Sequence, residues 1–62
     1  MEDIFKIYIE QVDPATNKFV KGKTVAHLED EKYAANIAIL LSQIDNGGDG
    51  SRQYKYAKLE NK

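Results

Sequence analysis

The stretch EKYAANIAILLSQID, from Glu31 to Asp45, decides the fold of this 62-residue chain. At 100° per residue its apolar residues fall on one broad stripe, which predicts a single amphipathic helix. The stripe consists of Tyr33, Ala34, Ile37, Ala38, Leu40, Leu41 and Ile44. Asp30 is suited to cap the start of the helix, and the Asn-Gly pair at 46–47 to end it in a left-handed conformation. A small apolar patch, Ala35 with Ile39, projects from the opposite side.

Three segments around the helix alternate between apolar and polar residues with a period of two, which is typical of strands. They run from residue 4 to 10, from 19 to 28 and from 52 to 59. The turn signal DPATN at 13–17 lies between the first two segments, so these should form a hairpin. The side chains expected to pack beneath the helix are Phe5, Ile7, Ile9, Tyr54 and Tyr56.

The second strand has two possible registers, because both of its faces contain apolar residues. If Val20 points toward the helix, then so do Thr24, Ala26 and Leu28. The other face then carries Phe19, Lys21, Lys23 and Val25. Gly22 favours a bulge, which would change this register partway along the strand.

The expected fold belongs to the α+β class, with its elements in the order ββαβ. The first strand is the most hydrophobic, so it should lie at the centre of a three-stranded sheet of order 2-1-3, antiparallel to both neighbours. The preference for right-handed crossovers places the third strand parallel to the second. The helix covers one face of the sheet and leaves the other open. Residues 1–62 make one domain, whose small core makes a second subunit one way to stabilise it.

The composition favours an ordinary intracellular protein. Nine basic and ten acidic residues give a net charge of −1, so overall charge points to no class of partner. The longest uncharged stretch is far shorter than the ~20 residues that span a bilayer. The first three residues carry acids where a signal peptide carries bases. We therefore expect a cytoplasmic protein without a membrane partner.

No motif in the sequence predicts catalysis. The loop from Asp45 to Gly50 matches a calcium loop only in part, because Gly47 and Tyr56 stand where its third and twelfth residues should be ligands. His27 is the only histidine and the chain has no cysteine, which argues against a zinc site. A domain of this size also lacks room for a ligand pocket of ordinary volume. We expect no enzyme activity, no metal or other cofactor and no small-molecule substrate.

The open face of the sheet is the candidate partner-binding site. It is expected to carry Lys6, Tyr8, Phe19, Lys21, Lys23, Lys55, Ala57 and Leu59, together with Glu10 and Gln53. Its apolar members favour a protein partner, or a second copy of the chain in a homodimer. Its lysines around Tyr8 leave nucleic acid as the alternative, through phosphate contacts and base stacking. The patch of Ala35 with Ile39 is a second candidate contact.

Three stretches of the sequence suggest a relationship: the DPATN turn at 13–17, the helix sequence EDEKYAANIAILL at 29–41 and the closing YKY strand at 54–56. With these stretches the chain resembles small uncharacterised ββαβ proteins of phages and mobile elements of Gram-positive bacteria. The resemblance covers most of the chain but rests on structural motifs, so it transfers no activity and no functional residue. It implies a host-interaction or regulatory role rather than a metabolic one.

Overall fold

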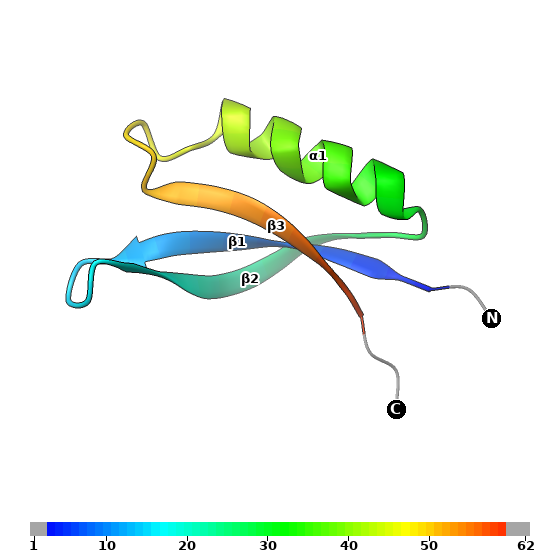
Figure 1. The fold of residues 1–62 in the computed structure, drawn as a ribbon, viewed down its shortest axis with the longest axis horizontal. Coiled ribbons are helices and arrows are strands. Elements are labelled where there is room, and N and C mark those ends of the chain that lie inside the picture. The colour runs from blue at the N-terminus through cyan, green and yellow to red at the C-terminus, as the bar shows by residue number, and fades with distance from the viewer. Residues whose placement is uncertain (1–2, 60–62) are drawn as a thin grey trace.

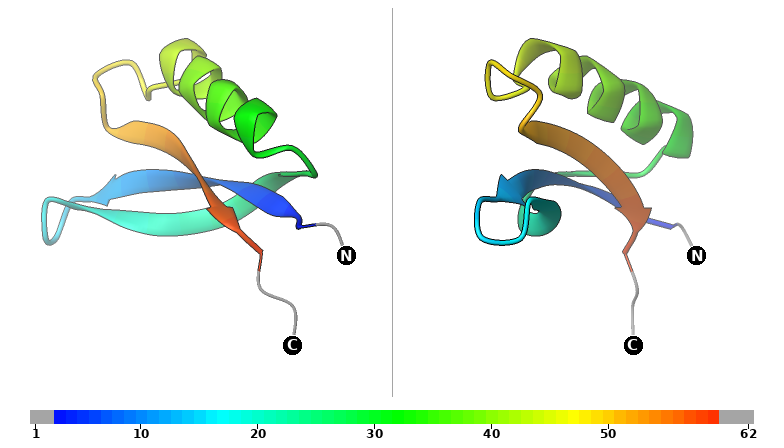
Figure 2. Two further views of the ribbon diagram at one scale, coloured as in Figure 1. Left: turned by 45° about the vertical axis from the view of Figure 1, so that its right-hand side comes forward. Right: turned by 60° about the vertical axis from the view of Figure 1, so that its left-hand side comes forward.

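The computed structural model of the chain describes residues 3–59, which form three strands and one helix (Figure 1). The elements are β1 (Phe5–Asp13), β2 (Lys18–Leu28), α1 (Glu31–Ile44) and β3 (Arg52–Lys58). The strands form one sheet in the order β2-β1-β3, and α1 lies over one face of it (Figures 1 and 2). The α+β class, the ββαβ order and the central position of the first strand are thus confirmed.

The prediction that the third strand is parallel to the second is not confirmed. β2 and β3 lie on opposite sides of β1, and each pairs with it in the antiparallel sense, so both strand pairs of the sheet are antiparallel. β2 and β3 are not neighbours, so no parallel strand pair forms between them, although both run opposite to β1. Here α1 carries the chain past β1 to its free edge, and all pairing is made with β1.

The turn between β1 and β2 forms as its residues predict. The carbonyl oxygen of Asp13 accepts hydrogen bonds from the amides of Thr16 and Asn17 at 3.1 and 2.6 Å. Its carboxylate also accepts one from the amide of Ala15 at 3.0 Å. Asn17 has a φ of 61°, the left-handed conformation that asparagine tolerates better than most residues.

The register of β2 changes twice, on either side of the residue that pairs with Tyr8. Val20 pairs with Gln11 on the helix side, and Thr24 pairs with Tyr8. Residues directly opposite in an antiparallel pair share a face. Thr24 therefore lies on the open face, whereas an unchanged register from Val20 would have turned it toward the helix. The predicted irregularity near Gly22 is confirmed, because one register change falls between the partners of Tyr8 and Glu10.

Gly22 is required at this place because β2 approaches β1 closely there. A Cβ atom at residue 22 would lie 2.6 Å from Cγ2 of Ile9 and 3.1 Å from its carbonyl oxygen. Real Cβ atoms do not come so close to a stiff β-branched side chain. The absence of a side chain therefore permits the local bulge.

The helix begins where the sequence indicates and ends slightly earlier. The carboxylate of Asp30 accepts hydrogen bonds from the amides of Lys32 and Tyr33 at 2.8 and 3.4 Å, which confirms it as the N-cap. Asp45 is the C-cap residue, with φ −132° and an amide that donates to the carbonyl of Leu41 at 2.8 Å. The left-handed residue, Gly47, lies in the loop beyond it with φ 79°, so the expected left-handed end of the helix is not formed.

The core of the described residues is thin. Its buried hydrophobic residues are Phe5, Ile7, Tyr8, Ala34 and Ala38. Among these only Ile7 is a large side chain with no exposed surface. The radius of gyration is 12.4 Å, against about 10–11 Å for a compact chain of this length. The sheet is thus covered incompletely, and much apolar surface stays in contact with water.

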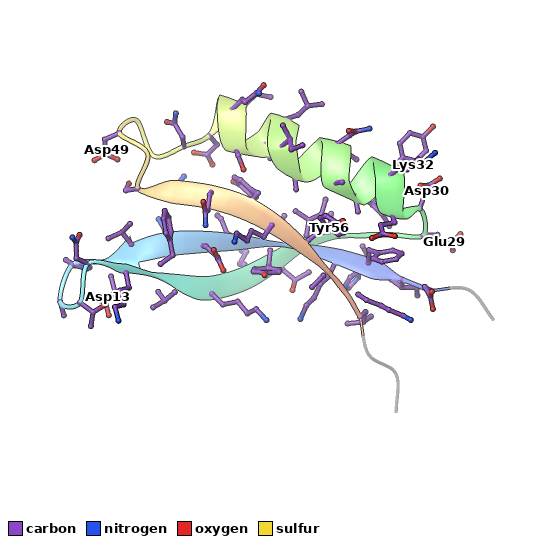
Figure 3. All side chains as sticks on the ribbon, in the orientation of Figure 1. Asp13, Glu29, Asp30, Lys32, Asp49 and Tyr56 are labelled. Carbon is purple, nitrogen blue, oxygen red and sulfur yellow. The ribbon has the colours of Figure 1, made fainter. Side chains whose placement is uncertain are left out.

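Two tyrosines of β3 reach from the sheet to the two ends of α1. The hydroxyl of Tyr54 donates to Oδ2 of Asp45 at 2.7 Å, beyond the last turn of the helix. The hydroxyl of Tyr56, the β3 residue labelled in Figure 3, donates to Glu31 in the first turn at 3.2 Å. The same ring meets Phe5 edge to face. The prediction that both tyrosines pack beneath the helix is confirmed by these contacts.

Ser42 joins the helix to the outer edge of β3. Its Oγ accepts a hydrogen bond from the amide of Tyr54 at 2.8 Å and lies within donating distance of the carbonyls of Tyr54, at 3.2 Å, and Ala38, at 2.8 Å. The outward-pointing backbone groups of Tyr54 are thereby occupied by a helix side chain. α1 accordingly packs chiefly on β3 and less on β1 and β2. Within residues 3–59, no helix has the length and apolar character needed to span a membrane.

Candidate interaction surfaces

The open face is built by the alternation of β1 and its two neighbours. Lys6 pairs with Ala57, and Tyr8 pairs with Lys55, so all four lie on the face turned away from α1. Glu10 is held on the same face by Gln53, whose Nε2 donates to its carboxylate at 2.7 Å. On the other side of β1, the open face continues with Phe19, Lys21, Thr24 and His27 of β2.

Tyr8 is the centre of this face but is not an exposed ring. Only 9% of its surface is accessible, because lysine side chains lie over it. The ammonium of Lys21 is 4.8 Å from the ring centroid and that of Lys6 is 5.9 Å away, both within the range of a cation–π contact. Tyr8 therefore offers little accessible ring for base stacking or an apolar contact.

The remaining residues predicted for this face are dispersed. Phe19 is 42% exposed and pairs with Val12 toward the hairpin tip. Lys23 and Val25 lie at the two register changes and have no direct partner on β1. Leu59 follows β3, half-buried, and its amide donates to the carbonyl of Ile4 at 2.7 Å. The open face is thus a lysine-rich surface around a covered tyrosine, with its apolar residues at the periphery.

The predicted helix patch is smaller than expected. Ile39 is 56% exposed, as its position opposite the stripe indicates. Ala35 is half-buried and not exposed, so it adds little apolar surface beside Ile39. A single exposed isoleucine is common on folded proteins and does not mark a site.

Three strongly exposed large side chains lie on a flank of α1 that the sequence assigned to the core. Tyr33 is 66% exposed, Leu40 53% and Ile44 79%, although all three belong to the predicted apolar stripe. Ala34 and Ala38 are buried against the sheet instead. We name the flank formed by Tyr33, Ile37, Leu40 and Ile44 the outer stripe, of which Ile37 is half-buried.

The outer stripe faces the β2 side of the molecule. Ser42 and Ala35 lie on the opposite flank of α1, and Ser42 contacts the outer edge of β3. The helix therefore sits toward β3, and it covers the helix-side face of β2 less than it covers β3. Val20 on that face is 48% exposed. Tyr33, Leu40 and Ile44 of the outer stripe and Val20 of β2 are thus apolar side chains left exposed on the helix side of the molecule.

A signal for the outer stripe was present in the sequence. The seven residues of the predicted apolar stripe cover a wider arc than one helix can place against one small sheet. They separate into an inner set at 34, 38 and 41, and an outer set at 33, 37, 40 and 44. Each set has the 3–4 spacing of a helix seam.

Asp45, Arg52 and Tyr54 form a polar cluster that joins the end of α1 to β3. Asp45 receives the hydroxyl of Tyr54 on one oxygen and Nη1 of Arg52 on the other, each at 2.7 Å. The hydrogen bond from Tyr54, with the Arg52 charge beside it, lowers the pKa of Asp45 below its ordinary value. The same hydrogen bond raises the pKa of Tyr54. Both shifts favour the bonded state, and they tie the loop to β3.

The residues between 3 and 59 contain no group of three or more His, Cys, Asp or Glu side chains placed to hold a metal ion. Their hydrogen-bonded clusters join elements of the fold to one another. No protein-family model, curated protein or solved structure matches the chain.

Proposed function

We propose that this chain is a non-enzymatic binding protein that acts through protein–protein contacts, with the outer stripe of α1 as its docking surface. The observation that carries the proposal is the exposure of Tyr33, Leu40 and Ile44 along one flank, while small alanines fill the buried side of the same helix. Contiguous apolar patches of this kind on small proteins mark interaction sites.

The energy of covering the outer stripe supports the proposal. Complete burial of a large apolar side chain contributes about 1.5–3 kcal/mol. Because these side chains are 53–79% exposed, covering them would recover about 1–2 kcal/mol each. Three such anchors on one helix flank match the way partners recognise an amphipathic helix, through residues spaced by three and four.

The proposed setting follows from the sequence. A cytoplasmic protein with a regulatory or host-interaction role agrees with the resemblance to phage and mobile-element proteins. Within that setting, the chain itself performs no chemistry and changes the behaviour of the partner that it binds.

A second candidate function is nucleic-acid binding by the open face. The observation that favours it is the grouping of Lys6, Lys21 and Lys55 around Tyr8, with Glu10 as the nearby acid on that face. Lysines spaced over an exposed sheet can contact phosphates without reading sequence. The lysine cover over Tyr8 supports phosphate contacts rather than base stacking.

The protein-binding proposal is tested with a matched pair of variants. Leu40→Asp places a charge in the outer stripe, and Ile39→Asp places the same charge at a residue of nearly equal exposure on the other side of α1. Immobilised wild type and variants are incubated with nuclease-treated lysate of cells that encode the chain, and retained proteins are quantified by mass spectrometry. Proteins kept by wild type and Ile39→Asp but lost by Leu40→Asp support the proposal; equal retention by all three contradicts it.

The nucleic-acid candidate is tested by fluorescence anisotropy with single- and double-stranded DNA and RNA. The variant with Lys6, Lys21 and Lys55 changed to Gln should lose binding and its salt dependence, because each phosphate contact releases counterions. Wild-type protein that shows no binding even at low salt removes this candidate.

A further inference from the structure

We propose that the partner of the outer stripe is a second copy of this chain, and that the two α1 helices pair in parallel about a two-fold axis running along them. This inference rests on the proposed function, since a second copy is one kind of protein partner. It adds the identity of that partner, the orientation of the pair and the residues that meet at the axis.

The spacing of the outer stripe carries the inference. Steps of four, three and four residues separate its members, which places Tyr33 and Leu40 at the d positions of a heptad and Ile37 and Ile44 at the a positions. β-branched residues at a, with leucine at d, favour two helices in parallel register. Since a two-fold axis along parallel helices brings each a residue beside its own copy, the stripe complements itself.

The residues that border the outer stripe offer no repulsion between two copies. The e positions are Ala34 and Leu41, and the g positions are Asn36 and Gln43. In a parallel pair, the g residue of one helix lies near the e residue of the other. All four are uncharged, so like charges do not meet there. The charged residues of α1, Glu31 and Lys32, fall at positions b and c, away from the axis.

The part of the sheet that α1 leaves uncovered is about as wide as one helix. Packed helices lie about 8–10 Å apart, which equals about two strand spacings. Because α1 packs chiefly on β3, a second helix beside it lies over β2, where Val20 is 48% exposed. A dimer of standard size buries about 800 Å² on each subunit, roughly a sixth of the 4754 Å² surface of this chain. The outer stripe of one short helix is narrow for that area, and β2 adds the needed surface.

Solution mass tests whether the two copies associate. Sedimentation equilibrium of the wild-type chain should give twice the monomer mass of 7.0 kDa, with dissociation on dilution. Leu40→Asp should weaken the dimer on the order of 100-fold or more, because it places two carboxylates within an apolar seam. Ile39→Asp should leave the dimer unchanged. A wild-type chain that stays monomeric at high concentration overturns the inference, as does a Leu40→Asp variant that remains dimeric.

Disulfide trapping tests the orientation, and the absence of cysteine from the chain makes the result easy to interpret. In a parallel pair, Ile44→Cys places the two thiols beside each other within the Cα separation of about 4.4–6.8 Å that a disulfide requires. Mild oxidation should convert this variant to a covalent dimer. Ile39→Cys, exposed on the opposite side, should stay monomeric. Failure of Ile44→Cys to cross-link, or equal cross-linking of both variants, overturns the parallel pair.

The two proposals fail in different ways. A monomeric wild type refutes the second copy as partner, yet the protein-binding function stands if Leu40→Asp still loses the proteins that Ile39→Asp retains. A dimeric wild type whose three forms retain the same proteins supports the second copy, and refutes any role of the outer stripe in binding another protein.

Discussion

Replacement of Ser42 by alanine tests how the helix is held to the sheet. The hydroxyl of Ser42 accepts the outward-pointing amide of Tyr54 at 2.8 Å, so Ser42→Ala leaves that amide without its partner. The hydroxyl also bonds back to the carbonyl of Ala38, but this carbonyl belongs to the helix and loses little when the serine is removed. The change therefore acts mainly on the junction between α1 and β3.

The expected size of the effect follows from the burial of this junction. A buried amide that loses its partner costs about 1–3 kcal/mol, and we take about 1–2 kcal/mol because Ser42 and Tyr54 are half-buried and water reaches them in part. Alanine favours a helix interior over serine by a few tenths of a kcal/mol, which offsets some of the loss. A net loss of about 1 kcal/mol lowers the Tm of a domain of this size by about 4–8 °C.

The measurement is thermal and urea unfolding of wild type, Ser42→Ala and a control, followed by circular dichroism. Gln43→Ala serves as the control because Gln43 is exposed in the same helical turn and makes no hydrogen bond to β3. The control should keep or slightly raise the Tm through helix propensity. If Ser42→Ala unfolds at the same temperature as Gln43→Ala, the hydroxyl does not stabilise the edge of β3 and the reasoning is refuted.

Three further changes test other parts of the fold. Gly22→Ala should destabilise the chain by about 1–3 kcal/mol in urea unfolding, because the added methyl group collides with Ile9; an unchanged midpoint would mean that β2 relaxes freely. Asp30→Ala should cost about 1 kcal/mol through loss of the N-cap, and Asp30→Asn should restore most of it. Stability should fall in acid as Asp45 is protonated. Folding lowers the pKa of Asp45, so its contribution to stability is fully present at a pH above its ordinary pKa of 3.8 and is lost as the pH falls through the folded-state pKa. Tyr54→Phe removes the largest cause of that shift, so its stability should depend less on pH in this range; an unchanged slope would assign the shift to other groups.

The elements of this fold could be predicted from the sequence because local chemistry determines them. The proline turn at 13–17 joins two alternating segments, and its asparagine accepts a positive φ. Asp30 is suited to cap the helix because it is an acid standing three residues before Tyr33, where the apolar pattern begins. The sheet order then follows from which strand is most hydrophobic. None of these inferences required knowledge of contacts between distant residues.

The rotation of the helix about its own axis, which decides which of its residues face the sheet, could not be predicted in the same way. A single apolar stripe from Tyr33 to Ile44 does not say which of its residues lie closest to the sheet. Ser42 decides this in the structure, because its bonds to Tyr54 draw α1 toward the edge of β3 and turn Leu40 away from the sheet. Such a contact depends on tertiary geometry, and no sequence pattern around a serine within a helix predicts that contact.

The sequence could not predict that lysine side chains cover Tyr8, for a related reason. Alternation correctly places Tyr8, Lys6 and Lys55 on the open face. It does not reveal that Lys21 arrives from β2 above the ring, because that position depends on the register changes on either side of Thr24. Long flexible side chains can cover an apolar ring on an exposed sheet, and the pattern of residue types treats them only as charges.

The two edges of the sheet have a consequence for how this chain can assemble without forming fibrils. Exposed strand edges are templates for open-ended growth, and apolar surface nearby increases that risk. At β3, the serine that occupies the backbone of Tyr54 interrupts the ladder that an incoming strand would need. At β2, two irregularities and the lysines at 18, 21 and 23 disfavour a flat, neutral pairing. Growth by strand addition is therefore opposed at both edges of the sheet. The helix side remains for contact between copies, and the proposed two-fold pair would be a closed assembly that adds no further copy.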